Sequence, residues 1–158
     1  MDDSSRFDSL LEDLVERGYQ VHRAEDHAVV RDPETAESFD MWPVGGWVQI
    51  GHVLLEAEEL SASQSASLLH RFALRFQNRA LGCRFALDDP GSLAIVSDFR
   101  LAEDSLDRLI ACLDQITFVG DVALDAFLRV LRNARCLSDA EVDEIFDRCW
   151  NAIEETED

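Results

Sequence analysis

The chain has 158 residues, which is enough for one domain with a hydrophobic core. Its 33 acidic residues outnumber 14 basic ones, all arginine, and the net charge of -19 disfavours nucleic acid and anionic membranes while favouring basic protein partners. The apolar runs are too short for a membrane helix, and the acidic start Met1-Asp2-Asp3 is unlike a signal peptide, so we expect a cytoplasmic protein.

The first predicted element is an amphipathic helix near the N-terminus. Apolar residues recur there at the spacing of three and four that places them on one helix face, namely Phe7, Leu10, Leu11, Leu14 and Val15. Ser4 or Ser5 is the expected N-cap, and Gly18 is the expected end of the helix.

Two strand-forming segments follow the helix. Residues 19–31 predict one strand that either runs through or folds back in its middle. Residues 37–44 predict a strand end or an edge strand, because Pro43 cannot donate to a neighbouring strand. Gly45-Gly46 then gives the signal for a hairpin turn.

The segment 47–57 is the strongest strand in the sequence. Its alternation places two apolar sets on opposite faces, the first being Val48, Ile50 and Leu54 and the second Trp47, Val53 and Leu55. Because both faces are partly apolar, we expect the sheet to be covered on one side and used for binding on the other.

A second helix is expected over residues 61–79. Its apolar stripe consists of Leu68, Leu69, Phe72 and Phe76. Arg71, Arg75 and Arg79 recur every four residues in a stretch without acidic residues. This row is interpreted either as a solvated face or as a contact with a second, acidic copy of the chain.

The stretch CRFALDDPGSLAIVSDFRL, residues 83–101, predicts a β-hairpin. Pro90 and Gly91 suit the central pair of a type II turn, and turn chemistry explains Asp88-Asp89 better than a metal or acid–base site. The alternation of side chains predicts two apolar faces. Cys83, Phe85 and Leu87 share one face, and Leu93, Ile95, Phe99 and Leu101 share another. A lone hairpin is marginal in water, so we expect a five-stranded sheet that includes it.

Two helices complete the predicted order. Residues 104–132 follow helical spacing, with either a kink or apolar residues on more than one side around Gly120. Ser138 and Glu141 predict a capping box that begins a last helix, 138–153, before an acidic tail. The expected fold class is α+β, with the order α-β-β-β-α-β-β-α, an antiparallel sheet packed by helices, and an extra C-terminal helix.

Residues that could carry chemistry are sparse. His52 and His70 are expected at the margin of the core. The cysteines are far apart and are expected to act as small core residues, namely Cys83, Cys112, Cys136 and Cys149. Because the sequence has neither metal-ligand spacing nor a catalytic or cofactor-binding motif, we expect no enzyme activity, no metal and no cofactor.

Several stretches together carry a resemblance to a known family. They are SRFDSLLEDLVERGY, WVQIGHVLLEA, SASLLHRFALRFQNRALG, CRFALDDPGSLAIVSDFRL and SLDRLIACLDQI. With the order of elements, the small size and the acidity, they resemble the class I chaperones of bacterial type III secretion, the Tir-chaperone family, over about residues 5–132. The most similar type is the broad-specificity export-control chaperone of plant-pathogenic bacteria. Helix 138–153 departs from the family plan, so we expect a chaperone-like domain over 1–135 and an appended helix and tail over 136–158.

The resemblance implies a cytosolic homodimer that binds the N-terminal region of secreted effector proteins as an extended chain. Strand addition to the sheet and apolar grooves would hold this client in an export-competent form. The implied client-binding residues are Leu10, Leu14, Val29, Val48, Ile50 and Leu54. The implied dimer interface consists of Leu69, Phe72, Arg75, Phe76 and Phe85. The appended helix is a candidate contact for the export ATPase, and neither nucleic acid nor membrane insertion is expected.

Three other functions stay open at this stage. The YbjN-like group, a family of acidic bacterial proteins with a similar plan, is associated with regulation and would bind no secretion client. An acidic immunity or antitoxin protein would bind a single toxin tightly. A small-molecule enzyme is the weakest alternative, because it requires a deep pocket with perturbed titratable groups.

Overall fold

The structure is a computed structural model of the chain. It describes residues 2–58, 71, 82–87, 91–101, 105–133 and 136–155. Three predicted features therefore lie outside the described residues: most of the helix 61–79, the turn residues 88–90 and the end of the acidic tail. Arg71, within the predicted helix, is described and has helical conformation.

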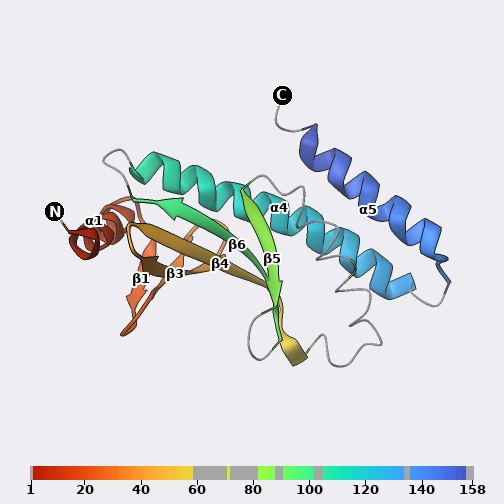
Figure 1. The fold of residues 1–158 in the computed structure, drawn as a ribbon, viewed down its shortest axis with the longest axis horizontal. Coiled ribbons are helices and arrows are strands. Elements are labelled where there is room, and N and C mark those ends of the chain that lie inside the picture. The colour runs from red at the N-terminus through yellow and green to blue at the C-terminus, as the bar shows by residue number, and fades with distance from the viewer. Residues whose placement is uncertain are drawn as a thin grey trace.

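Within the described residues, six antiparallel strands form one sheet in the order β1-β2-β3-β4-β6-β5. The strands are β1 (Gln20–Arg23), β2 (Ala28–Arg31), β3 (Ser38–Val44), β4 (Trp47–Leu55), β5 (Cys83–Leu87) and β6 (Leu93–Arg100). Figure 1 shows this sheet with helices packed against it, which confirms the predicted α+β class.

The predicted count of five strands is wrong because residues 19–31 fold back on themselves. β1 pairs with β2 from Gln20 opposite Arg31 to Arg23 opposite Ala28. The tight connection is closed by the backbone N–H of Ala24, which donates to the carbonyl oxygen of His27 at 2.9 Å. Of the two alternatives that the sequence left open for this segment, the chain adopts the hairpin.

Three helices are described: α1 (Asp3–Glu16), α4 (Ser105–Asn133) and α5 (Asp139–Glu154). α1 and α4 pack on one face of the sheet, and α5 runs alongside α4 (Figure 1). The apolar side chains between these elements form one core, in which the largest fully buried members include Phe39, Phe85, Phe127, Phe146, Leu11 and Leu14. One face of the sheet is thus covered, as its alternation predicted.

The helix ends follow local sequence signals, with one correction. The N-cap of α1 is Asp2 and neither Ser4 nor Ser5, because the Asp2 carboxylate accepts from the backbone N–H of Ser5 at 2.8 Å. Gly18 ends this helix with a φ of 98°, a conformation that glycine adopts readily.

The hairpin β5–β6 pairs as predicted, but its two apolar sets lie on the same face. Phe85 lies directly opposite Ile95, and Leu87 directly opposite Leu93. Because directly paired side chains share a face of the sheet, the prediction of separate faces is wrong. Gly91 has a φ of 106°, as the third position of a type II turn requires.

A bulge at the end of β4 shows that the predicted sheet face of Leu55 is wrong. The register shifts between Val53, which pairs with Ala94, and Leu55, which pairs with the buried Leu93. Leu55 is consequently buried instead of sharing the open face with Trp47. A β-bulge changes the alternation of side chains in this way because it adds one residue to a single strand.

Candidate binding groove between helix α1 and strand β1

Strand β1 forms one edge of the sheet beside α1. It stands at the end of the strand order, and in the described part of the chain its only strand partner is β2. An edge strand presents backbone N–H and C=O groups that can pair with an added extended segment. This edge can therefore accept a further strand.

An open groove of about 510 Å³ lies between α1 and β1. Leu11 is buried at its base, Val21 is half-buried, and Val15 is 54% exposed. Leu11 and Val15 lie on one face of α1 because they are four residues apart. The groove thus offers an apolar surface directly next to the open edge of the sheet.

The rim of the groove is acidic. Glu12 and Glu16 also lie four residues apart on α1, and neither contacts a cation among the described residues. Arg23 on β1 is the basic residue of the rim, but its guanidinium donates to the Asp8 carboxylate and, at 3.3 Å, to the Asp8 carbonyl oxygen. With Arg23 neutralised, the rim favours a segment that carries Lys or Arg beside an apolar side chain.

None of the six predicted client-binding residues lines this groove. Leu10, Leu14, Val48 and Ile50 are at most 4% exposed and belong to the core. Val29 is half-buried on β2, and Leu54 is half-buried against α4. The sequence assigned core positions to a binding surface because alternation does not tell which apolar side chains the helices cover.

Sequence reasoning missed the groove residues as a group. Val15 belongs to the predicted helix stripe, but it is exposed in the structure. Glu12, Glu16 and Val21 have no distinguishing pattern in the sequence. Only the approach of β1 to α1, which local sequence patterns do not reveal, assembles them.

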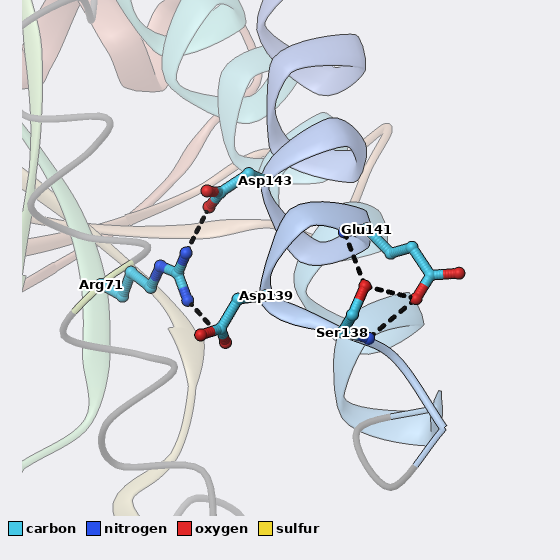
Figure 2. Close-up of polar contacts among 5 residues, drawn as sticks. All are labelled: Arg71, Ser138, Asp139, Glu141 and Asp143. Carbon is cyan, nitrogen blue, oxygen red and sulfur yellow. Dashed lines mark hydrogen bonds and ion pairs between the residues drawn. The ribbon is translucent and has the colours of Figure 1, made fainter.

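The predicted dimer interface is described only at Phe85, which is 1% exposed and packed in the core of its own chain. Leu69, Phe72, Arg75 and Phe76 lie outside the described residues. Arg71, from the same predicted helix, donates to Asp139 at 3.0 Å and to Asp143 at 2.7 Å, both on the first turns of α5 (Figure 2). Arg71 thus pairs with α5 of its own chain.

The buried thiols of Cys83 and Cys149 are poor candidates for nucleophilic chemistry. Burial raises the pKa of Cys149 to about 12, and burial with the nearby Cys112 raises that of Cys83 to about 11. Cys83 and Cys149 are core residues as predicted, whereas Cys112 is half-buried and Cys136 is exposed. Among the described residues no group of three or more His, Cys, Asp or Glu is arranged to hold a metal ion.

His52, which was expected at the margin of the core, is buried and lies between two acceptors. Its Nδ1 is 2.9 Å from the carbonyl oxygen of Ser38, and its Nε2 is 3.1 Å from the Glu37 carboxylate. His70 lies outside the described residues. Within the described ranges, no helix has both the length and the apolar character to cross a membrane.

Comparison with known proteins supports the fold but shows no family. No protein-family model matches the chain, and no curated protein sequence matches it either. An uncharacterized protein from Methanothermobacter thermautotrophicus has a similar structure, with a TM-score of 0.57 and 21% identity over 80% of this chain and 99% of that chain.

Two similar structures come from type III secretion. A chain of the heterodimeric ExoU–SpcU complex of Pseudomonas aeruginosa matches with a TM-score of 0.52 and 14% identity, over 71% of this chain and 92% of that one. The structure of the Yersinia pestis type III secretion chaperone SycH with a stable fragment of YscM2 gives a TM-score of 0.49 and 20% identity. The match covers 74% of this chain and 96% of that chain. The chain therefore shares its α+β fold with a protein of a type III secretion system.

Proposed function

We propose that this protein is a type III secretion chaperone, which holds the N-terminal region of one or more effector proteins in an extended, export-competent form. The groove between α1 and β1 carries the proposal, because it combines an apolar surface, an open sheet edge and an acidic rim. A bound segment would add a strand to β1 and place alternate side chains in the groove. The fold likeness to a chain of the ExoU–SpcU complex supports this function.

The proposed client segment is apolar and basic. Its apolar side chains would contact Leu11, Val15 and Val21, and its Lys or Arg side chains would lie near Glu12 and Glu16. The net charge of -19 would attract such a segment over a longer range. The proposal includes a homodimer in the cytoplasm and a contact of α5 with the export ATPase, and it includes no catalytic reaction.

The first experiment is affinity capture from the native bacterium while its secretion genes are expressed. Captured proteins would be identified by mass spectrometry, and the retained region would be mapped by limited proteolysis. We expect secreted proteins, protected in their N-terminal regions. Val15→Asp should greatly reduce their recovery, because the exposed Val15 would become a carboxylate inside an apolar groove.

Phe118→Asp provides the matched control for this experiment. Phe118 is 38% exposed on α4, so its replacement also removes an exposed apolar side chain and adds a carboxylate, but away from β1. Recovery should be unchanged in this variant. If Val15→Asp, folded by circular dichroism, captures the same secreted proteins as the unmodified chain, the groove is not the client site. If no secreted protein is captured by the unmodified chain, the function is not secretion.

A further inference from the structure

A second surface lies on the sheet face turned away from α1 and α4, where β3 and β4 meet their hairpin turn. Val44 and Trp47 are directly paired there, and they are 60% and 47% exposed. Arg100 on β6 pairs directly with Trp47 on its other side. Two large apolar side chains and one guanidinium thus form a continuous row across three strands.

The Arg100 guanidinium lies over the Trp47 ring, with its central carbon 5.9 Å from the ring centroid. A cation–π contact of this kind restrains the guanidinium while leaving its N–H groups available to an acceptor. No carboxylate contacts Arg100 among the described residues, although acids outnumber bases by 33 to 14 in this chain. Arg100 is therefore a pre-positioned donor without an acceptor in the described part of the chain.

The carboxylate that lines the hollow on this face, Asp98, is already paired. Val44, Trp47, Gln49 and Asp98 line a shallow hollow of about 300 Å³. The Asp98 carboxylate accepts two hydrogen bonds from Arg84 and one from Gln49, and the bonds from Arg84 are the main cause of its lowered pKa. Asp98 thus stays ionised and paired with Arg84. The uncompensated charge beside the hollow is positive and comes from Arg100.

We propose that Val44, Trp47 and Arg100 form a docking site for a segment of a partner protein in which a carboxylate follows an apolar side chain. The apolar side chain enters the hollow against Val44 and Trp47, and the carboxylate accepts from Arg100. Tryptophan and arginine are the residue types that most often dominate protein interfaces. The net charge of -19 repels a uniformly acidic partner, so a single carboxylate beside an apolar residue is the chemistry that fits. This site is independent of the groove at β1.

The test uses two matched probes, acetyl-Leu-Glu-amide and acetyl-Leu-Gln-amide, titrated into the full chain at millimolar concentrations. The readout is the indole N–H signal of Trp47 in ¹H–¹⁵N NMR spectra, assigned by its loss in Trp47→Phe. We expect a saturable shift with the glutamate peptide. The affinity for the uncharged glutamine peptide should be roughly threefold to tenfold lower, because a hydrogen bond to a charged group is lost.

Arg100→Gln and Arg108→Gln separate a specific site from a general charge effect. Arg108 is exposed on α4 and, like Arg100, contacts no acid among the described residues. Arg100→Gln should remove the preference for the glutamate peptide, and Arg108→Gln should preserve it. Equal binding of both peptides, preference retained in Arg100→Gln, or no response to either peptide would each overturn the proposal.

Discussion

Gly120 allows the middle of α4 to approach β4 closely. A Cβ at this position would lie 2.8 Å from the Cδ2 of Leu54 and 3.8 Å from side-chain atoms of His52 and Ile95. The chain therefore has a helix-disfavouring residue where the helix meets the sheet, at a cost of about 1 kcal/mol relative to alanine. Close packing, and not a break in the helix, explains the glycine, because α4 is continuous from Ser105 to Asn133.

Gly120→Val should lower the free energy of unfolding by about 2 kcal/mol through overpacking. An alanine methyl group requires only that the end of the half-buried Leu54 rotate, whereas the branched valine also presses toward His52 and Ile95. Urea denaturation followed by circular dichroism measures the change. Ala111→Val, at an exposed position of α4, is the control and should cost less than about 1 kcal/mol. Equal losses in both variants would show that contact with β4 is not the reason for Gly120.

Individual elements differ in how far their sequences predict them. The capping box of α5 and the glycine end of α1 depend on residues within one turn, and both were predicted correctly. The hairpin of β1 and β2 and the bulge before Leu55 depend on contacts with neighbouring strands. Local patterns therefore gave the fold class, but they could not separate the buried Leu14 from the exposed Val15. That distinction, on which the candidate groove rests, requires the position of β1.

The capping box of α5 gives a prediction at the scale of one element. The Ser138 hydroxyl accepts from the backbone N–H of Glu141, and the Glu141 carboxylate accepts from the backbone N–H of Ser138 at 2.8 Å (Figure 2). Ser138→Ala leaves the backbone N–H of Glu141 without the hydroxyl that accepts from it, and it should destabilise the protein by about 1 kcal/mol. Urea denaturation of the full chain provides the measurement.

Ser4→Ala is the corresponding control in α1. Ser4 is exposed within the first turn, and Asp2 supplies the cap of that helix. The control should therefore have nearly the same free energy of unfolding as the unmodified chain. A loss in Ser4→Ala as large as that in Ser138→Ala would mean that the hydroxyl of Ser138 has no special role as a cap.

At the scale of the whole molecule, the balance between net charge and ion pairs affects stability. The net charge of -19 produces repulsion that destabilises the compact state. Three of the described ion pairs, Arg17–Asp107, Arg23–Asp8 and Arg84–Asp98, have side chains that are about half exposed or more. Exposed pairs contribute about 0–1 kcal/mol each, so we expect the repulsion to outweigh them.

Added salt should therefore stabilise this protein. Raising the NaCl concentration from about 0.01 M to about 0.1 M shortens the screening length from about 30 Å to about 10 Å, which weakens the long-range repulsion more than the close ion pairs. We expect Tm, measured by differential scanning calorimetry at neutral pH, to rise by several degrees. As the pH is lowered toward the isoelectric point near 4.3, the magnitude of the net charge decreases. The rise of Tm with NaCl should therefore become smaller. A Tm that falls with NaCl at neutral pH would show instead that the ion pairs, and with them the contact of Arg71 with α5, dominate the electrostatic part of the stability.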